Sequence, residues 1–187
     1  MVRMADPAAI IFDVDRTLVD LQNFTDYGAA LADLEDLLGQ PGGADVPHAD
    51  WDAPTLACMA ILVGLAGDPR WYEASGLVAA HERAAIPGSK PMPGLASAGA
   101  ACGPVPYALA TLLPADVARE ALAFHGFDVD VVIGRDPHIR PKPSGACLVE
   151  AAARLGVNVS DTVMIGDRKS TRLNSSHEWI SRMPSSA

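Results

Sequence analysis

Short apolar runs alternate with longer amphipathic stretches along most of this chain. Four brief apolar runs predict buried strands, at residues 8–12, 105–111, 129–133 and 162–165. Three stretches with helical spacing alternate with the later runs, at 93–102, 114–125 and 144–155. Ser144 and Gly156 are suitable residues to begin and end the last of these helices. Strands that alternate with helices predict an α/β fold with a doubly wound parallel sheet.

A second group of helical patterns lies between the first and second predicted strands. Apolar residues recur at helical spacing in three segments, 21–39, 53–66 and 71–85. Segments rich in proline and glycine separate and follow them, at 41–50 and 86–94. We therefore expect a helical cap at 21–86, inserted into a sheet domain formed by 1–20 and 87–166.

The composition is that of a globular protein and excludes several functional classes. The 187 residues are 49% hydrophobic and 20% charged, with a formal net charge of −9 that disfavours a nucleic-acid partner. The chain has no apolar run of about 18 residues and no apolar N-terminal signal, so we expect no membrane segment. Cys58, Cys102 and Cys147 are widely spaced, and an odd count without CxxC spacing argues against a disulfide framework or a zinc site. These features predict a cytoplasmic protein.

Polar residues follow each predicted strand at the edge where ligands bind in such sheets. Asp13 and Asp15 follow the first strand, Thr111 ends the second, Lys142 lies after the third and Asp167 follows the fourth. Carboxylates held close together repel each other and favour binding of a cation. Hard oxygen ligands with open positions are typical of Mg²⁺, which also contacts substrate phosphates.

These residues match, in order, the four motifs of a known superfamily. Asp13-Val14-Asp15-Arg16-Thr17, then Thr111, Lys142-Pro143 and Gly166-Asp167 resemble the motifs of the haloacid dehalogenase-like (HAD) hydrolases. The resemblance covers about residues 8–168, and the position of the insert is similar to that in the helical-cap subgroup that includes phosphoglycolate phosphatases. It implies a Rossmann-like sheet domain with a helical cap.

The resemblance also implies a role for each of these residues. Asp13 would be the nucleophile that forms an aspartyl-phosphate, and Asp15 would be the general acid and base. Thr111 and Lys142 would bind the phosphoryl group. Asp13, the backbone carbonyl of Asp15, and Asp167 would hold Mg²⁺.

Each residue also has a simpler explanation. An Asp at a strand end can be a turn former, Thr111 can be an ordinary strand residue, and Lys142 can be a solvated loop charge. Trp51 and Trp71 in the insert are expected to pack within the cap, although they could face substrate.

The sequence departs from the family at two places within the motifs. Arg16 stands where the family usually has Gly; it either strains the turn or reaches a substrate anion, and the sequence leaves both open. Thr171 and Arg172 stand where a further acid is usual, and the fifth strand and last helix of the family are missing. We therefore expect a C-terminally truncated sheet and weak or no activity.

The last residues suggest a non-biological origin for this departure. Residues 167–177 and 181–187 equal the in-frame translation of the constant stretches of a common sequencing-library adapter. Our hypothesis is that 167–187 is a non-native tail, which we expect to be disordered because it lacks an apolar face. Asp167 would then match the family motif by coincidence.

The resemblance leads to one functional expectation and two alternatives. We expect a Mg²⁺-dependent phosphomonoester hydrolase that acts on a small soluble phosphate ester. One alternative is a metal-independent dehalogenase, which the presence of Asp15 disfavours. The other is a non-catalytic phosphate-binding or regulatory protein, made inactive by Arg16. The sequence leaves the substrate and the oligomeric state open.

Overall fold

A parallel four-stranded sheet forms the centre of the structure. The computed structural model describes residues 6–39, 42–44, 51–139 and 144–166. Across the sheet the strands follow the order β5 (Val132–Ile133), β4 (Tyr107–Ala110), β1 (Ala9–Phe12) and β6 (Thr162–Ile165). The predicted α/β fold with a doubly wound parallel sheet is confirmed.

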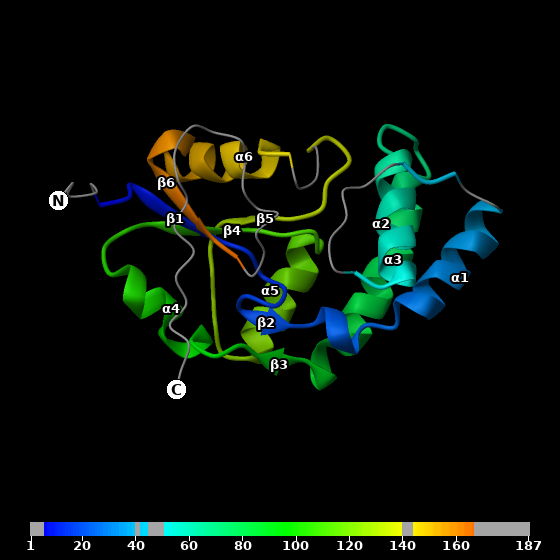
Figure 1. Ribbon diagram of the computed structural model, residues 1–187, viewed down its shortest axis with the longest axis horizontal. Coiled ribbons are helices and arrows are strands. Elements are labelled where there is room, and N and C mark those ends of the chain that lie inside the picture. Colours follow the sequence, from blue (N-terminus) through cyan, green and yellow to red (C-terminus); the bar gives the residue numbers. More distant parts are fainter. Residues whose placement is uncertain (1–5, 40–41, 45–50, 140–143, 167–187) are drawn as a thin grey trace.

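Helices cover both faces of this sheet, α6 on one face and α4 and α5 on the other (Figure 1). Their bounds are α4 (Leu95–Cys102), α5 (Ala115–Phe124) and α6 (Ala146–Leu155), and a short 3-10 turn at Val159–Asp161 precedes β6. Successive strand residues point to opposite faces. Phe12 packs in the buried cluster of α4 and α5, whereas Ile11 packs in the cluster of α6. Apolar side chains on both faces explain why the strands read as continuous apolar runs.

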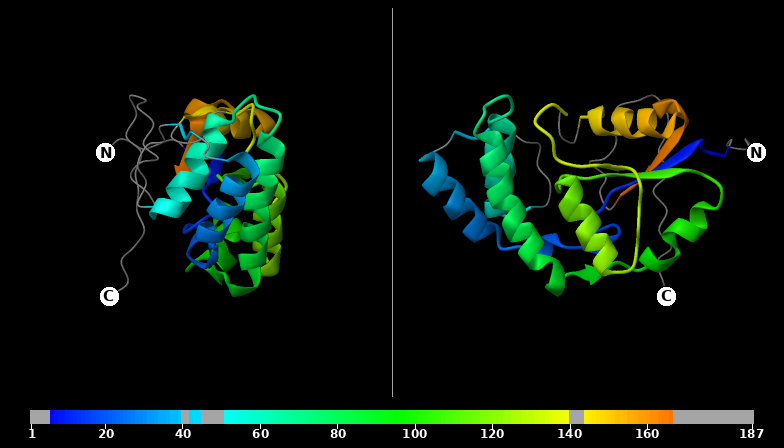
Figure 2. Two further views of the ribbon diagram at one scale, coloured as in Figure 1. Left: turned by 90° about the vertical axis from the view of Figure 1, so that its right-hand side faces the viewer. Right: turned by 180° about the vertical axis from the view of Figure 1, so that it is seen from behind.

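Three of the four α-helices described between β1 and β4 form a separate group beside the sheet. They are α1 (Tyr27–Leu38), α2 (Ala53–Gly64) and α3 (Trp71–Ala85), and Figure 2 shows them together at one end of the molecule. They share a buried cluster of their own, in which Trp71 is buried and Trp51 is partly buried. The tryptophans therefore pack within the insert, as predicted.

The chain enters and leaves the insert through one small structure. Strand β2 (Val19–Asp20) pairs antiparallel with β3 (Lys90–Pro91), so that the two connections lie side by side. Short 3-10 turns adjoin them, at Gln22–Phe24 and Ile86–Gly88. Within the described ranges, no helix is both long and apolar enough to cross a bilayer.

The first helix of the insert begins later than its apolar pattern predicts. We expected a helix from residue 21, but α1 starts at Tyr27, where the Asp26 side chain accepts a hydrogen bond from the Ala29 backbone. Leu21 is instead fully buried in the cluster of α4 and α5. Its apolar character reflects packing against the sheet domain and not the face of a helix.

Candidate active site

Asp13 lies directly after β1, near the middle of the sheet. Its backbone N–H donates to the carbonyl of Ile165, at the end of the adjacent β6, over 2.8 Å. Its Oδ1 accepts a hydrogen bond from the Val14 N–H, also over 2.8 Å. The carboxylate is thereby held at the edge formed by the carboxyl ends of the strands, where α/β sheets bind their ligands.

Asp15 has a more buried carboxyl group than an ordinary surface residue. Its Oδ1 accepts hydrogen bonds from the backbone N–H groups of Leu21 and Gln22, each over 2.9 Å. Burial raises the pKa of Asp15 to about 6; the two backbone hydrogen bonds oppose the rise, and the negative charges of Asp13 and Asp20 add to it. Asp15 can therefore hold or release a proton close to neutral pH.

Thr111 follows β4, the strand next to β1. Phe12 is paired with Leu109, so Thr111 lies one position further along its strand than Asp13 does. Its backbone N–H donates to Ile133 over 2.9 Å, and its Oγ1 accepts from the N–H of Leu113 over 3.2 Å. The hydroxyl can still donate its own proton to a ligand.

The structure thus places three of the predicted site residues on neighbouring strand ends. Asp13, Asp15 and Thr111 share the carboxyl edge of β1 and β4. Lys142 and Asp167, as well as the proposed tail, lie outside the described residues. The roles assigned to all five residues remain predictions.

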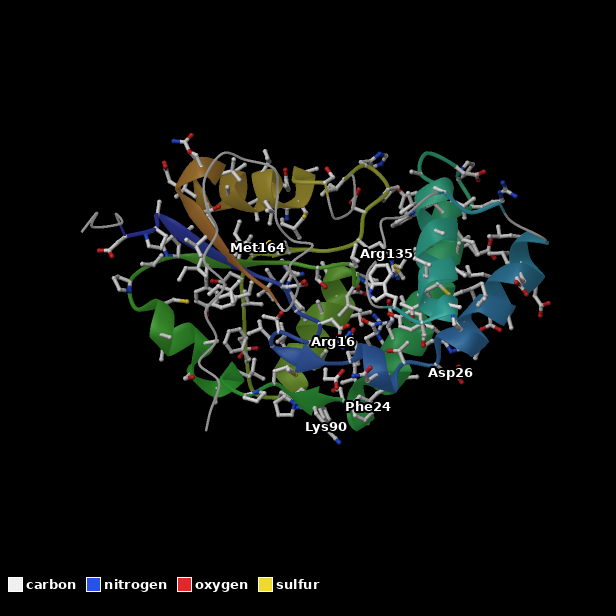
Figure 3. The ribbon with its side chains drawn as sticks, viewed as in Figure 1. Arg16, Phe24, Asp26, Lys90, Arg135 and Met164 are labelled. Atoms are coloured by element: carbon white, nitrogen blue, oxygen red, sulfur yellow. The ribbon has the colours of Figure 1, made fainter. Side chains whose placement is uncertain are left out.

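Arg16 lies in a tight turn that joins β1 to β2. Its φ is +60°, and among the described residues it is the one non-glycine residue with a positive φ. Its N–H donates to the Val19 carbonyl over 2.7 Å, while the N–H groups of Leu18 and Val19 donate to Val14. The left-handed conformation costs a residue with a Cβ atom about 1–2 kcal/mol. The turn therefore takes the shape for which glycine is suited, with Arg in its place (Figure 3).

The oxygen donors at this edge have the chemistry that Mg²⁺ prefers. The Asp13 carboxylate and the Asp15 backbone carbonyl are hard oxygen ligands. None of the hydrogen bonds within the described residues ends on that carbonyl. The described part of the chain has no cluster of three or more His, Cys, Asp or Glu side chains that could hold a metal. Two donors therefore fit the ion, and the third predicted donor is Asp167.

The sequence analysis missed a buried charged network beside this edge. Arg135, two residues after β5, forms a bidentate ion pair with Glu82 of α3, and the Tyr27 hydroxyl donates to Glu82 over 3.1 Å. Burial raises the pKa of Glu82, and Arg135 and Tyr27 counter that rise. Burial also raises the pKa of Tyr27, with contributions from the charges of Glu82 and Asp15. The network is therefore near enough to Asp15 for their charges to interact.

A sequence signal for this network exists on α3. Ser75, Val78, Ala79, Glu82 and Ala85 are spaced three or four residues apart and are all buried. A glutamate within such a stripe requires a buried partner. The sequence does not identify that partner, because Arg135 is 53 residues further along the chain.

Gly134, the residue before Arg135, allows the backbone to lie close to the loop at residues 113–115. A Cβ atom on Gly134 would lie 2.3 Å from the Ala115 nitrogen and 2.7 Å from the Leu113 carbonyl oxygen. Only glycine allows this approach, which brings the Arg135 N–H within 2.8 Å of the same carbonyl.

Comparison with known proteins identifies the family of this arrangement. The family model described as haloacid dehalogenase-like hydrolase matches residues 7–170. No curated protein matches the sequence significantly.

Solved structures with the same fold include several hydrolases. A hydrolase from Pseudomonas syringae is similar over 86% of this chain and 76% of its own, with a TM-score of 0.60 and 19% identity. CbbY from Rhodobacter sphaeroides, in complex with xylulose-1,5-bisphosphate, is similar over 88% and 80%, with a TM-score of 0.61 and 19% identity. A HAD family hydrolase from Deinococcus radiodurans with bound phosphate and sodium is similar over 88% and 74%, with a TM-score of 0.50 and 17% identity. At these identities the likeness supports the fold.

Proposed function

The chain belongs to the haloacid dehalogenase-like hydrolases, and we propose that it hydrolyses phosphate monoesters of small soluble molecules through a phosphoenzyme formed on Asp13. The family places it among the hydrolases, a class of enzymes. The phosphate ester, the Mg²⁺ dependence and the intermediate are our proposal.

One observation carries this proposal: two carboxyl groups at one strand end differ in environment. Asp13 lies at the tip of β1 with one oxygen fixed by Val14, whereas Asp15 accepts two backbone hydrogen bonds and burial raises its pKa to about 6. A nucleophile must be an anion, whereas a general acid must carry a proton near the working pH. The raised pKa suits Asp15 to the second role, and we assign the first to Asp13.

The proposed reaction gives each of these residues a role. A carboxylate oxygen of Asp13 attacks phosphorus, the bond to the leaving oxygen breaks, and Asp15 gives its proton to that oxygen. Asp15 next accepts a proton from a water molecule, which attacks phosphorus and releases inorganic phosphate from Asp13. The Thr111 hydroxyl donates to a phosphoryl oxygen throughout, and Lys142 contributes a positive charge.

Bound Mg²⁺ would offset the repulsion between an anionic nucleophile and an anionic substrate. The residues that would hold it are Asp13, Asp15 through its carbonyl, and Asp167. Two similar folds were solved with phosphate or a sugar bisphosphate, which agrees with phosphate chemistry on this scaffold. Cys58, Cys102 and Cys147 are buried, and because an odd number of widely spaced cysteines fits a reducing compartment, we propose that the enzyme is cytoplasmic.

The direct test is hydrolysis of p-nitrophenyl phosphate with and without Mg²⁺. We expect slow, Mg²⁺-dependent turnover that falls at least about 10³-fold in Asp13→Asn. Asp26→Asn is the matched control: the chemical change is the same, the side chain is exposed, and asparagine also caps a helix. Full activity without Mg²⁺, or in Asp13→Asn, would contradict the proposal.

Two further readouts separate the alternatives. Release of halide from a haloacid without metal would identify a dehalogenase. Thermal protection by beryllofluoride and Mg²⁺ without turnover would identify a phosphate-binding protein. If protection is equal in the wild type and Asp13→Asn, then Asp13 is not the phosphoryl acceptor.

A further inference from the structure

The Arg135 side chain satisfies every one of its hydrogen-bond donors within the protein. Nε donates to Ser75 Oγ over 3.1 Å, Nη1 to Glu82 Oε1 over 3.0 Å and to the Leu112 carbonyl over 3.4 Å. Nη2 donates to Glu82 Oε2 over 3.1 Å and to the Ser75 carbonyl over 3.2 Å. A guanidinium has five N–H groups, and five contacts are present. The side chain is thus committed to the protein and not to a substrate anion.

The partners of Arg135 come from both parts of the molecule. Ser75 and Glu82 belong to α3 of the insert, whereas Leu112 belongs to the loop after β4 in the sheet domain. Figure 3 shows Arg135 at the junction between the sheet domain and the helices of the insert. One side chain therefore fastens the insert to the sheet domain.

The same residue also holds the loop that carries Thr111. The backbone N–H of Arg135 donates to the Leu113 carbonyl over 2.8 Å, and the Leu113 N–H donates to Thr111 Oγ1 over 3.2 Å. Together with the contact to Leu112, this fixes three consecutive residues at the edge of the sheet. The position of Thr111 is thereby tied to the attachment of α3.

Removing one partner of a buried ion pair destabilises a protein more than removing one partner of an exposed pair. The side chains of Arg135 and Glu82 are only 6% and 1% exposed, so removal of either one leaves an unpaired buried charge. Arg83, the next residue on α3, also joins the insert to the sheet domain through Asp116 and Glu120 of α5, but it is 42% exposed. Water screens such an exposed ion pair, so its removal lowers the free energy of unfolding only slightly.

From these contacts we propose that Arg135 is a positioning residue that docks α3 on the sheet domain and sets the geometry of residues 111–113. Movement of the insert that separates α3 from this loop breaks the clasp formed by Arg135 and Glu82.

The test is amide hydrogen exchange on a set of matched variants of the full chain. Arg135→Met and Glu82→Met should each speed exchange at 71–85 and 111–113 at least about tenfold. The double variant should recover much of that protection, because no charge is left unpaired. Arg83→Met is the exposed control and should change exchange less than about twofold.

Other results overturn the proposal. One is exchange at 111–113 that is no faster in Arg135→Met than in Arg83→Met, and another is a double variant that is worse than either single variant. If a single variant fails to fold while the double variant folds, the clasp is supported. If methionine at position 135 prevents folding altogether, Arg135→Lys is used in place of Arg135→Met, since lysine keeps the charge but has three donors. Amide protection in Arg135→Lys that equals the protection in the wild type then overturns the proposal.

A second readout rests on the proposed function and separates positioning from stability alone. Arg135→Lys should weaken the binding of inorganic phosphate with Mg²⁺ at least about threefold, because Thr111 shifts, whereas Arg83→Lys should not. A wild type that binds no phosphate contradicts the proposed function, and the exchange data still decide the clasp. Equal phosphate binding in Arg135→Lys and the wild type contradicts the link to Thr111.

Discussion

At the scale of single residues, the site depends on two aspartates that the fold treats differently. Both follow β1, and burial raises the pKa of Asp15 to about 6. The sequence places these carboxyl groups two residues apart. It cannot show that the chain turns back so that the N–H groups of Leu21 and Gln22 face Asp15. The raised pKa of Asp15 is thus a product of tertiary structure.

Asp15→Asn should change stability in a pH-dependent way. The folded-state pKa of about 6 exceeds the ordinary value of 3.8, so protonation of Asp15 stabilises the folded protein, and this contribution is lost as the pH rises through 6. Asparagine imitates the protonated form and can accept the same hydrogen bonds. Without metal, the variant should be more stable than the wild type by on the order of 2 kcal/mol at about pH 8.

This gain should shrink as the pH falls through 6 and vanish near the ordinary pKa of an aspartate. Urea unfolding in EDTA across this range measures it. A gain of equal size at every pH would mean that the Asp15 charge is not what destabilises the folded state. A loss of stability at about pH 8 would mean that the carboxylate form is preferred in the folded protein, which contradicts the raised pKa.

At the scale of elements, the turn between β1 and β2 carries the clearest local strain. Of the two explanations open for Arg16 from the sequence, the positive φ favours a strained turn. Arg16→Gly should stabilise the protein by about 1 kcal/mol, because glycine adopts this conformation without steric cost. Arg16→Ala is the control, since it removes the guanidinium but keeps the Cβ atom. Unfolding midpoints that are equal for the glycine and alanine variants would show that the side chain, and not the backbone, determines the effect.

The elements themselves were largely predictable, but some boundaries were not. Strand and helix patterns depend on neighbouring residues, so the sequence predicted β1, β4, β6 and, within the described residues, α1 to α6. It began the first helix too early because Leu21 and Phe24 fit the helical spacing, although Leu21 packs against the sheet domain. It also gave a strand at 129–133, of which only Val132–Ile133 pairs with β4. Periodicity records which residues are buried and not what buries them.

At the scale of the whole molecule, the contacts that join the insert to the sheet domain were beyond the reach of the sequence. The ends of the strands could be assigned to one edge, since parallel strands share their direction. The attachment of α3 depends on Arg135 and Glu82, which no local pattern connects. The C-terminal half of α3 also buries Ala79 and Ala85 in the cluster of α4 and α5. The insert is therefore partly continuous with the core of the sheet domain.

The central claim is that Asp13 accepts a phosphoryl group, and covalent trapping tests it most directly. The full chain is mixed with p-nitrophenyl phosphate and Mg²⁺, quenched in acid and digested, and the peptides are weighed by mass spectrometry. We predict one added phosphoryl group on the peptide that contains Asp13, and none on the same peptide from Asp13→Asn. A phosphoryl group on another residue, or turnover that persists in Asp13→Asn, would contradict the account.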